Sequence, residues 1–373
     1  MLGIANAILL SQAAVYKNAA PISKVTPPGM MQAILENSKP RLLSNVVDDG
    51  SGYIRDVKVR FKTRMPAGKT NIGDNCVVNA EPSYGEQTIP ALSTRSYGVF
   101  FEYDKIEKYA ENALQVTNGA GSIQMAAEFM EELTAKMNGI LADVNADIYS
   151  AVASNVGRHA ASGSTAARTV NFPLAGTNDN LDAGFNRLMS DMALNEVQWS
   201  QLKAIGAGKS YVKWMQHMNS MVSANQSGIN TAALSMPKYY YDPTTATALG
   251  GADEFLMMDK DAVQFLNICK FRGYKGRKVA DSEFGIFPIS LTDSLGNPIN
   301  SFEFDVQVKY NTCPGDVEIL ESEDYPEASA KGRGVSVFLI ARYAPVFQDS
   351  ASYDSTDRLY LNNGLWNYDA TNS

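Results

Sequence analysis

The sequence is poor in histidine and cysteine, the residue types on which metal sites and triad-type catalysis most often depend. Its only histidines are His159 and His217, and its three cysteines are Cys76, Cys269 and Cys313. The cysteines stand far apart and show no zinc-type spacing, so we expect them to be reduced and buried. We therefore expect a protein without catalytic residues, cofactor or bound metal.

Long apolar runs and an excess of positive charge are also missing. No stretch reaches the roughly 18 apolar residues of a membrane span. The 32 lysines and arginines are outnumbered by 40 acidic residues, and the net charge of -8 disfavours tight, non-specific binding of nucleic acid by the whole chain. The apolar start, MLGIANAILLSQAA, has no preceding Lys or Arg, so we interpret it as an intracellular segment rather than a signal peptide.

What is present is a globular composition, with 45% hydrophobic residues, and one dominant helical period over residues 122–157. We expect Ser122 to be the N-cap and Gly157 to lie just beyond the last turn. Gly139 interrupts the heptad pattern, so the apolar stripe is expected to lie against a sheet rather than in a coiled coil. The stripe consists of Met130, Leu133, Met137, Leu141, Val144, Ile148 and Val152, and the polar flank of Glu128, Glu131, Lys136, Asn138, Asp143 and Asn145.

The clearest predicted strand covers residues 53–65. Val57, Val59 and Phe61 alternate with cationic residues, so one face of the strand is expected to be apolar and the other to carry a row of positive charge. Residues 97–103 predict a returning strand, which would make a hairpin with about thirty residues at its tip, far more than usual. A tip of that length favours contact with a partner. The cations at alternate positions are Lys58, Arg60, Lys62 and Arg64.

The remaining segments are interpreted from their composition and from the spacing of their apolar residues. The prolines of residues 1–45 favour extended backbone, which is either an arm lying along a neighbouring subunit or a frayed terminus. Residues 197–300 read as a separate α/β lobe, and the last 25 residues as a loosely packed tail. Further expected elements are short helices at 104–116, 181–192 (capped by Asn178 or Asp179), 211–221 and 262–269, strands at 255–259, 301–310 and 335–343, a loop at 158–178 and an acidic loop at 316–327.

One segment suggests an enzyme. Gly208, Lys209 and Ser210 match the end of a nucleotide-binding P-loop, and the strand at 255–259 would supply a metal-holding Asp259. However, the motif requires a glycine at position 203, where this chain has Lys203. An NTPase is therefore an alternative with an incomplete motif.

Other polar residues have plain structural interpretations. We interpret the carboxylates of Asp253, Glu254 and Asp259 as parts of a solvated turn, because no histidine accompanies them. His217 is interpreted as a packed or surface histidine rather than a base, and His159 as favouring the negative end of the long helix. The cationic strand face is either a solvated face that prevents edge-to-edge aggregation, a contact with acidic surface on another copy, or a contact with nucleic-acid phosphates, which the net charge disfavours.

The order of these elements resembles the major capsid protein of tailed bacteriophages, with its Hong-Kong-97-type capsid fold. KVRFKTRMPAGKTN through YGVFFEY resembles the extended loop, residues 122–157 the spine helix, FLMMDKDAVQFLNICK part of the axial lobe, and VFLIARYAPVF the closing strand. The resemblance implies an α+β fold with an N-terminal arm (1–45), an extended hairpin loop (46–103), a peripheral domain (104–196), an inserted axial domain (197–300), return strands (301–347) and a tail (348–373).

The resemblance also implies a structural, non-enzymatic role. Hexamers and pentamers would close into an icosahedral or prolate shell around double-stranded DNA, without sequence-specific binding and away from membranes. Scaffold, portal and decoration proteins would be further partners, and assembly would occur in the host cytoplasm. A surface-layer structural protein is a further alternative. The candidate inter-subunit contacts are the cations Arg55, Lys58, Arg60, Lys62, Arg64 and Lys69 and the acids Glu128, Glu131, Glu132, Glu321, Glu323 and Asp324.

Overall fold

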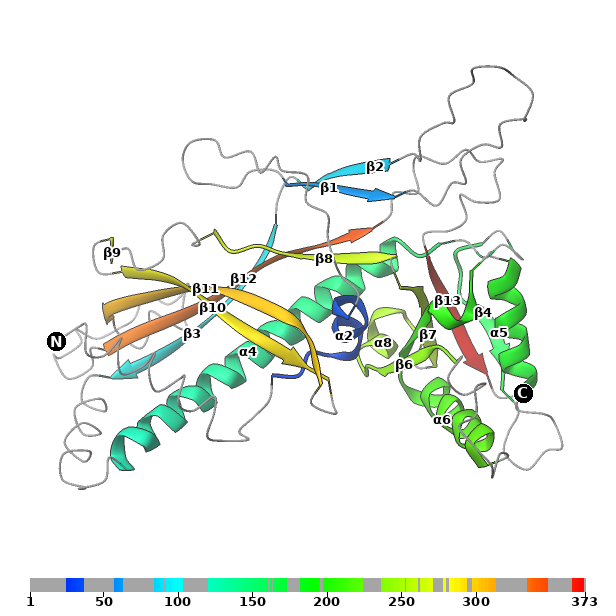
Figure 1. Ribbon diagram of the computed structural model, residues 1–373, viewed down its shortest axis with the longest axis horizontal. Coiled ribbons are helices and arrows are strands. Elements are labelled where there is room, and N and C mark those ends of the chain that lie inside the picture. Colours follow the sequence, from blue (N-terminus) through cyan, green and yellow to red (C-terminus); the bar gives the residue numbers. More distant parts are fainter. Residues whose placement is uncertain are drawn as a thin grey trace, which may run out of the picture. The chain divides into compact units, whose positions relative to one another are not determined.

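The structure is a computed structural model, and it is a mixed fold of helices and strands (Figure 1). It describes residues 25–36, 57–62, 84–89, 92–102, 120–157, 159, 162, 164–172, 182–194, 197–223, 236–251, 253–260, 262–270, 278–279, 282–293, 297–312, 334–347 and 364–371. By its internal contacts the chain divides into two compact units. The first unit comprises Met1–Pro27, Ser93–Val144 and Asn267–Tyr343, and the second Pro28–Leu92, Asn145–Leu266 and Ala344–Ser373. None of the described helices combines the length and the apolar composition needed to cross a membrane.

A six-stranded sheet, antiparallel from β3 to β9, draws most of its residues from the first unit (Figure 1). Its order is β3 (Ser93–Glu102), β12 (Gly334–Phe347), β11 (Pro298–Thr312), β10 (Ser282–Thr292) and β9 (Lys278–Val279), and β8 (Val263–Asn267) also pairs with β12. The predicted strands at 97–103, 301–310 and 335–343 are thus confirmed. In β11 the side chains of Phe302, Phe304 and Tyr310 are buried, whereas Val306 and Val308 are half-buried.

The long predicted helix is confirmed as α4 (Ala120–Ser154), which has 35 residues. The predicted stripe is buried from Leu133 to Val152, while Met130 lies in the first turns, whose side chains are not described. The helix contacts β3 of the sheet, because the Tyr97 hydroxyl donates to Asp143 Oδ2 at 2.8 Å. Asp143 belongs to the predicted polar flank, so this contact does not test the apolar stripe, and its packing against a sheet stays a prediction.

The predicted ends of the helix need small corrections: α4 begins at Ala120, so Ser122 lies inside the helix rather than at its N-cap, and the last helical residue comes one residue earlier than a C′ glycine at position 157 predicts. The helix stops at Ser154, and Asn155 Nδ2 donates back to the Ala151 carbonyl at 2.8 Å, which satisfies one of the last helical carbonyl groups. Gly157 lies beyond the cap and its N–H donates to the Leu365 carbonyl at 2.8 Å. Its role is to join the chain to a strand rather than to close the helix.

The second unit contains a mixed five-stranded sheet in the order β4 (Arg168–Asn171), β13 (Leu365–Thr371), β7 (Glu254–Asp259), β5 (Leu202–Gly206) and β6 (Lys238–Tyr241). β13 runs parallel to β4, and β5 parallel to β6, while β7 is antiparallel to both of its neighbours. The unit's helical elements are α2 (Gly29–Leu35), α5 (Asp182–Leu194), η1 (Trp199–Gln201), α6 (Gly208–Ser223) and α8 (Thr245–Ala248). The helices predicted at 181–192 and 211–221 and the strand at 255–259 are confirmed by α5, α6 and β7.

The core of this sheet is aromatic. The Phe185 ring of α5 lies 5.1 Å from the Trp214 ring of α6 and 5.2 Å from Phe172. Trp366 and Tyr368 of β13 are fully buried in the same cluster. Burial of side chains of this size is the main stabilising contribution to such a unit.

Three predicted segments differ from the structure. Residues 262–269, expected as a helix, contain β8, because a short apolar run does not distinguish a helix from a strand and here pairs with β12. The expected loop at 158–178 contains β4. The expected loose tail contains β13, which lies between β4 and β7 and is buried at Leu365, Trp366 and Tyr368. Its Asn and Asp residues are unusual in strands, so its sequence does not indicate one.

The arm and the lobe also need correction. Residues 29–35, expected as extended backbone, form α2, since Pro27 and Pro28 precede the helix and so do not break it. Residues 282–300, predicted to lie in the inserted lobe, contain β10 and the start of β11 in the six-stranded sheet. The expected elements at 104–116 and 316–327 lie outside the described residues.

Candidate assembly surfaces

The predicted cationic strand is present as β1 (Val57–Lys62), but its partner is not the predicted one. β1 pairs with β2 (Tyr84–Ile89), antiparallel, and β3 pairs with β12 instead (Figure 1). The hairpin is thus formed within residues 57–89, and its connection comprises residues 63–83. Among the described residues, β1 and β2 form a sheet of their own with no strand of another sheet hydrogen-bonded to it. A two-stranded sheet is only marginally stable in water by itself, so it needs packing against a further surface for stability.

The register of this hairpin places the cations of β1 at alternate positions. Lys58 is opposite Thr88, Arg60 opposite Glu86 and Lys62 opposite Tyr84. One of the three cations therefore has an acidic cross-strand neighbour, which offsets part of the positive charge. The other cationic candidates, Arg55, Arg64 and Lys69, lie outside the described residues.

The acidic candidates are only partly described. Glu131 and Glu132 are exposed on α4, and Glu128 lies in the first turns of that helix, whose side chains are not described. Glu321, Glu323 and Asp324 lie outside the described residues. The pairing of these acids with the cations of β1 stays a prediction about contacts between copies.

No pattern in the sequence indicates the best-defined polar site, which holds α2. Six of the seven residues of this helix are buried. Asp242 Oδ2 accepts from the Met30 N–H at 2.9 Å and from Asn145 Nδ2 at 2.9 Å, and Asn145 Oδ1 accepts from the Met31 N–H at 3.1 Å. Side chains from distant segments thus satisfy the first free N–H groups of α2. Asn145 was predicted on the polar flank of α4 and is buried instead, because it serves as this bridge.

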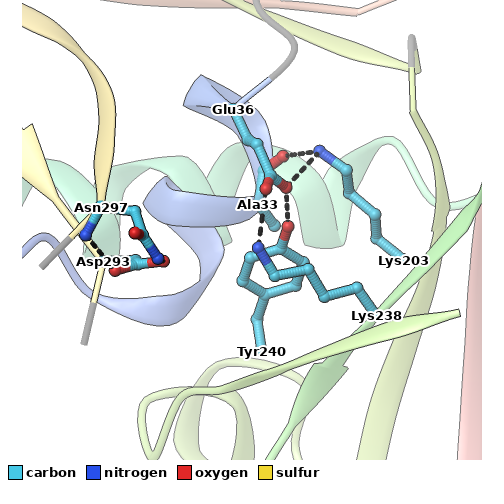
Figure 2. A network of polar contacts seen from close by, with 7 residues as sticks. All are labelled: Ala33, Glu36, Lys203, Lys238, Tyr240, Asp293 and Asn297. Atoms are coloured by element: carbon cyan, nitrogen blue, oxygen red, sulfur yellow. Dashed lines mark hydrogen bonds and ion pairs between the residues drawn. The ribbon is translucent and has the colours of Figure 1, made fainter. Parts of the chain in front are cut away.

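The other end of α2 is held by charge, as Figure 2 shows. Lys238 Nζ donates to Glu36 Oε1 at 2.7 Å, the Tyr240 hydroxyl donates to Glu36 Oε2, and Lys203 Nζ lies 3.6 Å from the same oxygen. Lys203 also donates to the Ala33 carbonyl near the end of the helix. Burial alone would raise the pKa of Glu36, but the hydrogen bonds from Lys238 and Tyr240 and the charge of Lys203 outweigh it and lower the pKa below 4.5.

This site explains why position 203 carries lysine, and the loop that follows does not form a phosphate cradle. β5 ends at Gly206 and α6 begins at Gly208, so only Ala207 separates strand from helix. The Ser210 hydroxyl donates to the Ala207 carbonyl at 2.9 Å, and Lys209 pairs with Asp253 at 2.6 Å. Both side chains that would hold phosphate or metal are therefore engaged within the protein.

The aspartate expected to hold the metal is also in the wrong place. β7 runs antiparallel to β5, with Asp259 opposite Leu202 and Phe255 opposite Gly206. Asp259 thus lies four strand residues, or about 13 Å, from the end of β5 that leads into α6. The geometry gives the NTPase alternative no support.

The carboxylates and histidines considered from the sequence have mostly structural roles. Glu254 Oε2 accepts from Asn367 Nδ2 at 2.6 Å, and Asp259 is buried rather than part of a solvated turn. Of the two positions predicted for His217, packed or on the surface, the structure shows the packed one, with its ring stacked on the Phe185 ring at 4.0 Å. Cys269 is buried, as predicted, while Cys76 and Cys313 lie outside the described residues. No group of three or more potential metal ligands occurs within the described part of the chain.

His159 differs from its prediction. It is buried, and its Nε2 donates to the Asn367 carbonyl of β13 at 2.9 Å, so its partner is a strand rather than the end of α4. Burial lowers the pKa of His159; the hydrogen bond to the Asn367 carbonyl opposes this shift, and the positive charge of Arg168 adds to it.

Comparison with known proteins gives matches only among solved structures. No protein-family model matches the chain, and no curated protein sequence matches it significantly. The capsid of cyanophage A-1(L) aligns with 94% of this chain and 94% of its own, at 11% identity and a TM-score of 0.47. The capsid of Staphylococcus phage Andhra aligns with 95% of this chain and 87% of its own (7% identity, TM-score 0.42), and that of cyanophage P-SCSP1u with 95% and 92% (9%, 0.38). These structures are phage capsids, the class that the sequence resembles.

Proposed function

We propose that this chain is the major capsid protein of a tailed phage, a structural protein that assembles into hexamers and pentamers of a closed shell around double-stranded DNA. The observation that carries the proposal is the β1–β2 hairpin, a two-stranded sheet that joins no other sheet among the described residues. Such a hairpin is stabilised by packing on another surface. Contacts of this kind between identical chains, repeated around an axis, close into rings.

Charge supports the same role. Lys58, Arg60 and Lys62 recur at alternate positions of β1, and Glu131 and Glu132 are exposed on α4. Opposite charges on two surfaces of one chain favour contacts between copies. The net charge of -8 keeps the wall of a shell from binding packed DNA tightly.

The finer features of the resemblance belong to this proposal. They are the six-part division of the chain, an icosahedral or prolate shell, partnership with scaffold, portal and decoration proteins, and assembly in the host cytoplasm into a virion. The proposed N-terminal arm, residues 1–45, includes α2, which the Asp242 and Glu36 sites attach to the second unit. The parts of the arm before and after α2 would extend away from the body of the protein.

Charge reversal tests the proposal. The variant Lys58→Glu, Arg60→Glu, Lys62→Glu, Arg64→Glu should remain folded, because Lys58, Arg60 and Lys62 belong to the separate two-stranded sheet and to neither of the two larger sheets. It should yield at least about tenfold fewer particles than the wild type, since like charges would then face each other between copies. Particles are counted by negative-stain electron microscopy, and folding is checked by circular dichroism and thermal unfolding.

A charge-conserving variant provides the matched control. Lys58→Arg, Arg60→Lys, Lys62→Arg, Arg64→Lys changes the same four positions and should assemble like the wild type. Normal particles from the charge-reversed variant would refute the role of the hairpin. A wild-type chain that stays monomeric at all the protein and salt concentrations tested would refute the capsid proposal itself.

A further inference from the structure

Four polar side chains of the second unit gather at the junction of β4 and β13. Tyr368 of β13 stands opposite Arg168 of β4 in the parallel register. An Arg168 guanidinium nitrogen lies 2.7 Å from Asp191 Oδ1 of α5, and the His159 ring packs edge-on against the Tyr368 ring at 4.9 Å. The chain thus brings together polar groups from the turn after α4, from two strands and from a helix.

Three of these side chains are almost completely shielded from solvent. Tyr368 is 0% exposed, His159 1% and Asp191 4%. Tyr368 Oη, His159 Nδ1 and Asp191 Oδ2 nevertheless have no hydrogen-bond partner among the residues that the structure describes. Leaving three such atoms unpaired in one interior cluster would be costly, because each buried polar group loses its hydration without compensation.

The chemistry of the three atoms defines what they can bind. The Asn367 carbonyl only accepts, so His159 Nε2 carries the proton and the unpaired Nδ1 of the neutral ring is an acceptor. Asp191 Oδ2 is also an acceptor, whereas the Tyr368 hydroxyl can donate one hydrogen bond. A ligand that donates twice and accepts once fits this set. Water has that capacity and needs only the space of a single small molecule.

We propose that His159, Asp191 and Tyr368 bind one buried water molecule, which donates to His159 Nδ1 and Asp191 Oδ2 and accepts from the Tyr368 hydroxyl. The Arg168 guanidinium, whose Nη1 lies 2.7 Å from Asp191 Oδ1 without hydrogen-bond geometry, holds that carboxylate by charge. The water links β13, the last of the described strands in the sequence, to His159 in the segment after α4 and to α5. This site is independent of the capsid proposal, because it concerns the interior of one chain.

The variant Tyr368→Phe distinguishes a hydrated site from a dry one by the sign of its effect. If the hydroxyl is bound to water, its removal should lower the melting temperature by about 2–4 °C, the shift that the loss of one hydrogen bond produces in a unit of this size. If the hydroxyl is unpaired, its removal should raise the melting temperature and would refute the proposal. Tyr149→Phe is the matched control, since the Tyr149 hydroxyl has a partner in Thr245 at 2.5 Å and its loss should lower the melting temperature.

Two direct measurements complete the test. A crystal structure of the purified chain at about 2 Å or better should show a single peak within hydrogen-bond distance of Tyr368 Oη and Asp191 Oδ2. An empty site, or a protein side chain in that place, would overturn the proposal.

Nitrogen-15 labelling of histidine gives only two sets of ring signals, because the chain has two histidines. His159, assigned by comparison with His217→Gln, should be the neutral tautomer with the proton on Nε2 at pH 7.5. A proton on Nδ1 would contradict the assigned acceptor. Stabilisation by ammonium chloride beyond that by sodium chloride would identify the ligand as ammonium and refute water.

Discussion

Gly139 shows how a single residue weakens the longest helix. It lies inside α4, where glycine costs about 0.5–1 kcal/mol relative to alanine. A Cβ atom at this position would lie 3.8 Å from the Tyr97 ring, an ordinary contact. Gly139→Ala should therefore raise the free energy of unfolding by about 0.5–1 kcal/mol, measured by urea denaturation.

Gly334 provides the opposite control for this substitution. A Cβ atom there would lie 2.0 Å from the Phe101 carbonyl oxygen of the neighbouring strand. Gly334→Ala should destabilise the protein, because the backbone of β12 must move away from β3. Equal effects of the two substitutions would contradict this account of local space.

His159 gives the chain a dependence on mild acid. Its pKa is lowered in the folded protein, chiefly by burial, so below about 6.5 the unfolded chain binds a proton that the folded chain does not. Stability should be unaffected by this residue above pH 7 and should fall as the pH decreases through 6.5, by at most about 1.4 kcal/mol per pH unit.

The measurement is the melting temperature between pH 7.5 and 5.5. His159→Gln cannot titrate and should show a flatter profile than the wild type, although its stability at pH 7.5 is lower. His217→Gln is the control for the other histidine. A wild-type slope retained in His159→Gln would show that acid acts elsewhere.

At the scale of elements, α2 depends on side chains that reach it from elsewhere in the chain. Asp242→Ala would leave the buried Met30 N–H and Asn145 Nδ2 without an acceptor, at about 1–3 kcal/mol each. We expect a loss of about 3 kcal/mol and faster hydrogen exchange in α2, with little change in β11. Mass spectrometry of exchanged peptides separates these two regions.

Lys238→Ala is the matched control for this helix. Lys238 also contacts α2 through Glu36, but its side chain is 55% exposed, and exposed ion pairs contribute little. Its loss should cost less than about 1 kcal/mol. A larger cost than that of Asp242→Ala would mean that charge, rather than the buried cap, holds the helix.

The elements also show what sequence patterns reveal and what they do not. α4, α5 and α6 follow a helical period over several turns, and the long strands β11 and β12 alternate or are continuously apolar, so they could be predicted. β8 and β13 are short, and their assignment depends on the strands beside them. The sites around Asp242 and Glu36 join residues that are far apart in the sequence. Met31 bonds to Asn145, about 100 positions away, and Met30 bonds to Asp242, about 200 positions away, so no local pattern could indicate these contacts.

At the scale of the whole molecule, the second unit requires all five strands of its sheet. β13 lies between β4 and β7, and Leu365, Trp366 and Tyr368 are fully buried. A chain ending at residue 363 would expose the facing surfaces of both neighbours and leave their inner edges unpaired. It should be insoluble or lack cooperative unfolding, and it should form no particles.

The control for this truncation ends at residue 371, after β13. It should be soluble, unfold cooperatively and assemble as the full chain does, because β13 is complete. Solubility, thermal unfolding and electron microscopy report on both chains. A cooperative, wild-type-like transition in the chain ending at 363 would show that the sheet does not need its fifth strand.

The position of β13 in the chain has a consequence during translation. The ribosome synthesises β4, β5, β6 and β7 before it reaches residues 365–371, and it must release those residues before they can enter the sheet. A nascent chain therefore holds the single strand β4 and the three-stranded piece β7–β5–β6, each with an open edge, until synthesis has passed residue 371. Neighbouring nascent chains on one messenger cannot present a finished second unit to each other, which delays association until each polypeptide is free.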